Sequence, residues 1–166
     1  SKPIHDGDFV LLDVWAKLDQ PDAVFYDITW TGSLGAPNRK HQEIFNVVRD
    51  ARDAAVNAAK QDMASGKRME GWQIDDASRG VITKAGYGDY FVHRTGHSIG
   101  VNVHGNGANM DNLETHDVRE ILPNTIFSVE PGIYLPEFGV RSEVDVLIRN
   151  GAAEVTGRVQ NEIVIL

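Results

Sequence analysis

The feature that most constrains the fold is a long stretch of helical periodicity over residues 39–64. Apolar side chains recur there at steps of three and four residues, which places them on one face of a helix: Ile44, Val47, Val48, Ala51, Ala55 and Ala58. Asn38 is suited to cap the first turn and Gly66 to stop the last one. The sequence therefore predicts one long helix from Arg39 to about Ala64.

A second helix is predicted from near Gln73 to Lys84, and Gly86 ends it. Its inward residues are expected to be Ile74, Ala77, Val81 and Ile82.

Strand-like segments lie on both sides of the two helices. Before them, "DFVLLDVWAKLDQPDAVFYDITWTG" predicts two strands around a turn, since Pro21 interrupts any continuous helix. After them, "GVNVHG" predicts a short strand, and "TIFSVEPGIYLPEFGVRSEVDVLI" predicts strands on both sides of a turn at Pro136 and Glu137. "AAEVTG" and "NEIVIL" are expected to be closing strands. This order favours an α+β domain over a doubly wound sheet.

Length and composition exclude several classes of function. A chain of 166 residues with 42% hydrophobic residues suits one domain with a real core. Its 24 acidic against 16 basic residues, a formal charge of -8, argue against a general surface for nucleic acid or anionic membrane. The chain contains no cysteine, which excludes disulfides and thiolate chemistry and is compatible with a cytoplasmic location. It also contains no apolar run long enough to span a membrane.

Each strand pair carries two carboxylates that are expected to face each other. A first turn centred on Gln20 places Asp13 opposite Asp27, and a second turn between Pro136 and Glu137 places Glu130 opposite Glu143. Like charges directly opposite each other destabilise a sheet. Such pairs therefore need divalent cations or a shared proton, unless they are solvated surface acids. The pairing alone leaves these alternatives open.

The segment "HRTGHSIGVNVHG" adds three histidines among glycines, His93, His97 and His104. It also matches the G-x-S-x-G pattern of serine hydrolases at Ser98, but no helix is predicted after that serine, as a nucleophile elbow requires. We therefore interpret Ser98 as a bystander.

Four carboxylates and one imidazole suit a pair of divalent ions such as Mn, Co, Fe or Zn. The remaining histidines, His5, His41 and His116, are interpreted as structural.

Four segments together resemble the pita-bread metallopeptidases: "YDITWTG", "HRTGHSIGVNVHG", "SVEPGIYLPEFG" and "VRSEVDVLI". That superfamily includes methionine aminopeptidase, aminopeptidase P, prolidase and the metal-free creatinase, and the form of these segments is most similar to the aminopeptidase P and prolidase branch. The resemblance implies a partial pita-bread fold, with a curved antiparallel sheet and two main helices. It implies five metal ligands, Asp13, Asp27, His97, Glu130 and Glu143, of which Asp27 and Glu143 bridge two ions.

The resemblance also implies roles in catalysis. A hydroxide between two divalent ions, Mn first and Co, Zn or Fe as alternatives, would attack an N-terminal peptide bond, chiefly Xaa-Pro. Glu130 would carry the proton, while His93 and His104 would contact the peptide and stabilise the tetrahedral intermediate. Arg141 would orient a carboxylate ligand. The alternatives are a metal-free binding relative, a creatinase-like C–N hydrolase, and an inactive fragment.

Some residues depart from the family pattern. Trp30 stands where the family often has arginine, and the first hairpin has extra residues near Gln20 to Asp22. The family also has an active-site histidine well upstream of the first aspartate, and His5 is too near Asp13 to be its equivalent. We therefore expect residues 1–166 to be a single catalytic domain that lacks the upstream part of its first half. The apolar face of the helices should then be partly exposed, which favours a homodimer.

Overall fold

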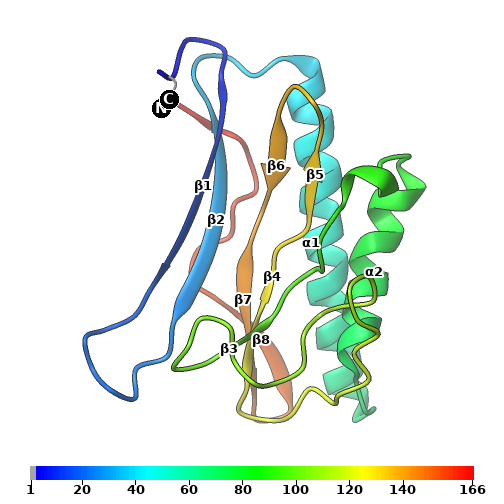
Figure 1. The fold of residues 1–166 in the computed structure, drawn as a ribbon. Helices are drawn as coiled ribbons and strands as arrows, with labels where there is room; N and C mark the ends of the chain where they lie inside the picture. Colours follow the sequence, from blue (N-terminus) through cyan, green and yellow to red (C-terminus); the bar gives the residue numbers. More distant parts are fainter. Residues whose placement is uncertain (1–2) are drawn as a thin grey trace.

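The structure is a computed structural model that describes residues 3–166. Figure 1 shows the first hairpin on the left, the later strands in the middle and both helices on the right. The elements in chain order are β1 (Phe9–Ala16), β2 (Tyr26–Ser33), α1 (Arg39–Ser65), α2 (Gly71–Lys84), the 3-10 turn η1 (Gly88–Tyr90), β3 (Ser98–Ile99), β4 (Ile126–Val129), β5 (Gly132–Tyr134), β6 (Gly139–Arg141), β7 (Val144–Arg149), β8 (Ala152–Thr156) and β9 (Val164–Ile165).

Both predicted helices are present, and local signals set their ends. The side chain of Asn38 accepts a hydrogen bond from the backbone N–H of His41, and Gly66 closes α1 in the left-handed conformation with φ of 66°. Helix α2 begins at Gly71, two residues before the predicted start. The reason is a capping box, in which Glu70 and Gln73 each bind the backbone of the other.

The first hairpin forms as predicted, but its register differs. Asp13 pairs with Thr29 and Trp15 pairs with Asp27, so the expected direct pair of Asp13 and Asp27 is wrong. The turn is centred on Pro21 and not on Gln20, which shifts the pairing by two residues. Because side chains alternate with a period of two, this shift keeps both aspartates on the same face of the hairpin.

The second pair of strands has the predicted register. Val129 pairs with Val144 and Gly132 with Arg141, so one register runs through β4 and β5 on one side and β6 and β7 on the other. Both strands are interrupted at the same level, where Glu130 and Glu143 lie. There the backbone N–H of Glu143 donates to the carbonyl of Thr29 at 3.1 Å, which joins this sheet to β2.

The strand predicted at "GVNVHG" is wrong. The extended residues are Ser98 and Ile99, and residues 101–104 form bends. The chain turns back because the N–H of Gly105 donates to the carbonyl of Ser98 at 2.6 Å. Alternating apolar residues there do not produce a strand, since this loop closes on itself and does not form a ladder with a neighbouring strand.

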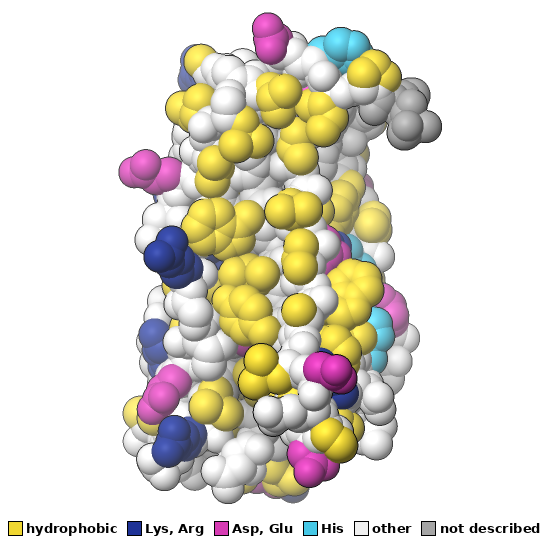
Figure 2. Space-filling model, turned by 90° about the vertical axis from the view of Figure 1, so that its left-hand side faces the viewer, with side chains coloured by type: hydrophobic (Ala, Val, Ile, Leu, Met, Phe, Trp, Pro, Cys, Tyr) yellow, Lys and Arg dark blue, Asp and Glu magenta, His cyan; other side chains and the backbone are white. Residues whose placement is uncertain are grey.

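The apolar face of the helices is buried, contrary to expectation. Ile44, Phe45 and Val48 of α1 are fully buried against the second half of the chain. The exposed apolar surface is the outer face of the first hairpin, where Leu12 is 63% exposed and Val14 is 44% exposed. Figure 2 shows apolar side chains gathered over the middle of this face. Within residues 3–166, no helix has the length and apolar character needed to cross a membrane.

Candidate metal centre

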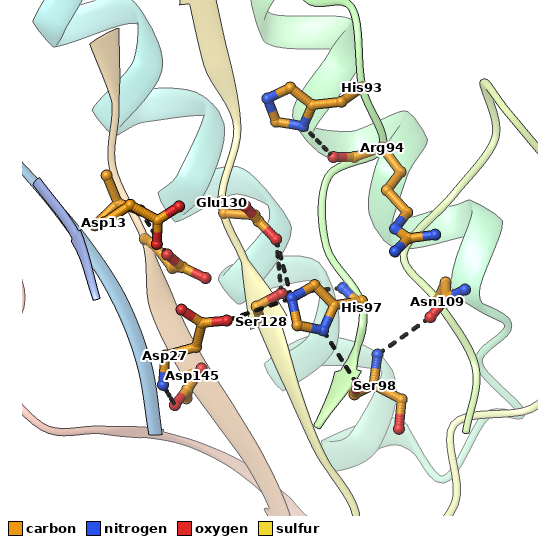
Figure 3. Close-up of polar contacts among 12 residues, drawn as sticks. Asp13, Asp27, His93, Arg94, His97, Ser98, Asn109, Ser128, Glu130 and Asp145 are labelled. Atoms are coloured by element: carbon orange, nitrogen blue, oxygen red, sulfur yellow. Dashed lines mark hydrogen bonds and ion pairs between the residues drawn. The ribbon is translucent and has the colours of Figure 1, made fainter. Parts of the chain in front are cut away.

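Carboxylates from both halves of the chain meet between the first hairpin and the interrupted strands (Figure 3). Asp27 on β2 and Glu143 before β7 are buried, with 5% and 1% exposure. One ligand atom each from Asp27, His97 and Glu143 lie within 4.8 Å of one another. Glu130 and Asp13 line the same cleft, so all five predicted ligands surround one region.

His97 directs one ring nitrogen at two of these acids. Its Nδ1 lies 3.1 Å from the carbonyl oxygen of Ser98, which can only accept, so Nδ1 carries a proton. Its Nε2 lies 3.5 Å from Asp27 Oδ2 and 3.4 Å from Glu130 Oε1. Burial alone would lower the pKa of His97, but the hydrogen bond to Asp27 and the charge of Glu130 raise it above its usual value.

Burial also changes the pKa values of the acids. Burial first, and then the charges of Glu130 and Asp27, raise the pKa of Glu143 from 4.5 to about 9. Burial raises the pKa of Glu130 as well, although the nearby His97 opposes the shift. One oxygen of Glu143 accepts from the hydroxyl of Thr29 at 2.7 Å. The other, Oε1, is buried without a hydrogen-bond partner among the described residues.

Arg141 brings a positive charge to the acids of this region. Its guanidinium forms an ion pair with Asp13, donates to the hydroxyl of Thr29 at 3.1 Å and lies 3.9 Å from Glu130. It thus contacts a carboxylate of the first hairpin and one of the second, which fits the predicted role of orienting a carboxylate.

His104 lies at the cleft and His93 lies away from it. The ring centroids of His104 and His97 are 4.4 Å apart, and His104 is exposed. The ring nitrogens of His93 are both engaged, Nδ1 with the carbonyl of Arg94 at 2.7 Å and Nε2 with the hydroxyl of Tyr134 at 2.6 Å. In this arrangement, Nδ1 of His93 carries the proton and Nε2 accepts from Tyr134. Burial lowers the pKa of both histidines.

Ser98 has structural contacts. Its hydroxyl accepts from the N–H of Gly107 at 3.1 Å, and its own N–H donates to Asn109 Oδ1 at 3.2 Å. These bonds, together with that from Gly105 to its carbonyl, hold the loop that carries His104. Ser98 therefore has a role in loop packing. No helix follows it in the described part of the chain, as a nucleophile elbow would require.

Sequence reasoning did not single out Asp145, Ser128 or Thr29. Asp145 is fully buried and accepts from the N–H of Asp27 at 3.0 Å, and burial raises its pKa to about 7. Ser128 accepts from the N–H of His97 at 3.0 Å and donates to Glu130 at 3.1 Å. The period of two along β7, which puts Asp145 on the same face as Glu143, was the available signal.

The donor set fits divalent cations. Buried carboxylates without enough positive charge or hydrogen bonds are costly, and coordinating an ion removes that cost. Glu143 Oε1 and Asp145 Oδ1 are buried atoms without partners among residues 3–166. Carboxylates with one imidazole are ligands that hard to borderline ions such as Mn, Fe, Co or Zn accept.

Comparison with known proteins is consistent with this donor set. The model of metallopeptidase family M24 matches residues 1–150. The chain is 36% identical, over 158 residues, to the Xaa-Pro dipeptidase of Pyrococcus furiosus. That match covers 94% of this chain and 42% of the relative, so the chain spans about two fifths of the relative's length.

Solved structures show the same fold. A prolidase from Thermococcus sibiricus aligns with a TM-score of 0.84 at 29% identity, over 99% of this chain and 42% of that one. An X-Pro aminopeptidase from Thermotoga maritima aligns with a TM-score of 0.82, also at 29% identity, over 98% of this chain and 43% of that one. The α+β arrangement with two main helices is therefore the pita-bread arrangement that the family resemblance implies.

Proposed function

Because the chain belongs to metallopeptidase family M24, we propose that it forms the metal site of a peptidase that hydrolyses N-terminal peptide bonds, chiefly Xaa-Pro bonds. The main support for the proposal is that three buried residues from distant parts of the chain lie close together: Asp27, His97 and Glu143. The similarity to an Xaa-Pro dipeptidase and to an X-Pro aminopeptidase supports the substrate class.

The proposed site holds two divalent ions, Mn in the first place. Asp27 and Glu143 would be shared by both ions, Asp13 would be a further ligand of one ion, and His97 with Glu130 would be ligands of the other. When bound, such ions supply a nucleophilic water and stabilise the negative charge that develops on the carbonyl oxygen. The carbonyl of Ser98 keeps a proton on Nδ1 of His97, so Nε2, which faces Asp27 and Glu130, is the nitrogen that would bind an ion.

Glu130 is the proposed proton carrier. Burial raises its pKa above that of an ordinary glutamate, which favours the exchange of protons with a reacting water and a leaving amine. The hydroxyl of Ser128 donates to its Oε1, and Arg141 lies near its Oε2. These two neighbours hold the carboxyl group in place while it changes charge.

The neighbouring histidines are proposed to contact the peptide. His104 is exposed at the cleft beside His97 and can donate to a developing oxyanion. His93 can reach a peptide only by exchanging its hydrogen bond with Tyr134. Arg141 keeps Asp13 oriented through their ion pair.

We further propose that the protein acts in the cytoplasm, since the chain has no cysteine, and that it forms a homodimer.

The metal assignment is tested by the metal content of the purified chain after incubation with Mn. We expect up to two ions per chain in the wild type and none in the variants Asp27→Ala and Glu143→Ala. Glu154→Ala, an exposed acid on β8, is the matched control and should bind as the wild type does. Unchanged ion content in both site variants would contradict the assignment.

The activity is tested with Xaa-Pro dipeptides and longer Xaa-Pro peptides in the presence of Mn or Co. The assay should use this chain and, in parallel, the longest form of the protein that cells make. Cleavage of dipeptides alone indicates a prolidase, and cleavage of longer peptides indicates an aminopeptidase P. If the long form cleaves neither class of peptide with either metal, the proposed function is wrong.

A further inference from the structure

One face of β1 carries both a site acid and a large aromatic side chain. Asp13 and Trp15 are two residues apart in the strand, so both point to the side of the hairpin that faces the cleft. The cleft measures about 250 Å³, and Trp15 lines it together with Val103 and the acids. Trp15 is nevertheless 54% exposed, so an indole ring beside the acids has much of its surface free.

Contacts between the hairpin and the loop of residues 100–105 fix this end of the cleft. The ammonium of Lys17 donates to the carbonyl of Val101 at 3.0 Å, and the N–H of Phe25 donates to the carbonyl of Gly100 at 3.0 Å. The hairpin thereby holds Trp15 and the loop holds Val103 in one apolar corner, directly beside the carboxylates.

The charges indicate which part of a peptide reaches this corner. The side chain of Asp13 is 36% exposed, against 8% for Asp27 and 15% for Glu130. The carboxylate of Asp13, which also pairs with Arg141 and is a proposed metal ligand, is therefore the most accessible of these three to an incoming ammonium group. A peptide whose N-terminal ammonium lies near Asp13 has its first side chain within reach of the next inward residue of the strand, Trp15.

We propose that Trp15 is a specificity-determining residue, the apolar wall that receives the side chain of the substrate's N-terminal residue. The site then prefers peptides that begin with an aliphatic or aromatic residue over peptides that begin with glycine. This inference rests on the proposed function, because it assumes that peptides bind with their N-terminus in this cleft.

The first test measures binding without cleavage. Calorimetry with the Mn-loaded protein compares leucine amide with glycine amide, which both carry an N-terminal ammonium but lack an Xaa-Pro bond. Partial burial of a leucine side chain against one wall should raise the affinity roughly fivefold over that of glycine amide. We expect that preference in the wild type, its loss in Trp15→Ala, and its retention in Trp15→Phe. Val14→Ala, the next residue on the opposite face of β1, is the matched control and should retain it.

The second test compares kcat/KM for Leu-Pro-Ala and Gly-Pro-Ala in the same variants. We expect Trp15→Ala to reduce the Leu-to-Gly ratio about fivefold, mainly through KM. If Trp15→Ala keeps the wild-type preference for leucine amide, the proposal is overturned, whatever the cleavage assay gives. If no peptide is cleaved but the preference for leucine amide depends on Trp15, the proposed function fails and the binding role of Trp15 stands.

Discussion

Buried acids dominate the molecule at the scale of single residues. Glu143 and Asp145 belong to one short segment, point the same way and are almost completely buried. Burial raises the pKa of Glu143 to about 9 and of Asp145 to about 7. Without bound cations, both groups therefore keep protons at a pH where ordinary carboxyl groups have lost them, and this couples folding to pH.

The metal-free protein should become less stable as the pH rises. Between about pH 4.5 and 9 the unfolded chain releases the proton of Glu143 while the folded chain retains it, so stability is highest below this window and is lost through it. Asp145 lowers the stability in the same direction as the pH rises from about 3.8 to about 7, because its pKa is raised between these values on folding. We expect a chelator-treated sample to melt at a lower temperature at pH 8.5 than at pH 5.5, as followed by circular dichroism.

The variants Glu143→Gln and Glu154→Gln separate this effect from general charge effects. Glu143→Gln removes the titrating group and should flatten the dependence of Tm on pH. Glu154→Gln, at an exposed position, should leave it unchanged. A metal-free wild type whose Tm rises from pH 5.5 to pH 8.5 would contradict the assigned environment of Glu143.

At the scale of elements, helix α2 positions the segment that carries His97. Asp75 of α2 is fully buried and accepts from both the N–H and the hydroxyl of Thr95, at 2.8 and 2.7 Å. Arg79, one turn further along, donates to Asp75 at 2.7 and 2.9 Å and to the carbonyl of His93 at 2.8 Å. The segment of residues 93–97 is thus held to the helix by one buried ion pair.

Removing Asp75 should both destabilise the fold and weaken the site. Asp75→Ala leaves Arg79 without its buried partner, and the loss of one partner of a buried pair costs about 3–5 kcal/mol. The metal affinity should fall as well, because Thr95 no longer fixes the chain two residues before His97. Urea unfolding and metal titration measure the two effects.

Asp76→Ala is the control for this prediction. Asp76 is the next residue of α2, is exposed and binds only the side chain of Asn112 in the described part of the chain. Its removal should cost under about 1 kcal/mol, as for other exposed polar contacts. Equal effects of the two substitutions would show that Asp75 has no special role.

The elements differ in how far the sequence alone predicts them. Helix α1 could be predicted almost to the residue, since Asn38 and Gly66 act on the neighbouring backbone. The register of β1 with β2 could not, because it depends on the conformation of the turn around Pro21, and a shift of two residues satisfies the apolar pattern equally well. The loop after Ser98 was mispredicted as a strand because its bends depend on bonds within the folded loop.

The residues of the candidate site also differ in how far the sequence alone predicts them. The four acids and His97 could be proposed from residue types and from family resemblance. The partners of these groups, Asp145 and Ser128, could not, since a hydrogen bond between Asp145 and Asp27 joins residues 118 positions apart. Trp15 was missed because an aromatic residue in a strand is usually part of a core, and only the fold shows that it faces the cleft.

At the scale of the whole molecule, one side remains apolar toward solvent. Leu12 and Trp30 form a cross-strand pair on the outer face of the first hairpin, next to the pair of Val14 and Ile28. Together with Tyr26 and Arg158 they line a groove of about 310 Å³. Exposed apolar patches of this kind promote association, so the proposed homodimer is expected to use this face and not the buried helices.

A charge on this face should keep the chain monomeric. We expect sedimentation velocity to show a larger monomer fraction for Leu12→Lys than for the wild type at equal concentration, because burying a lysine in an interface is costly. Leu122→Lys places the same charge at a leucine that is 54% exposed, against 63% for Leu12, and serves as the control. Equal monomer fractions in both variants would exclude this face as the contact.

The separation of the ligands along the chain has a consequence for synthesis on the ribosome. Asp27 and Glu143 meet in one cluster, although they are 116 positions apart in the chain. At roughly 5–20 residues per second, the second acid emerges about ten seconds after the first. During that interval the nascent hairpin has neither Arg141 nor the later acids beside it, so the full set of acids is available to cations only after Glu143 has been made. Loading of the proposed site therefore has to follow the synthesis of its last acid.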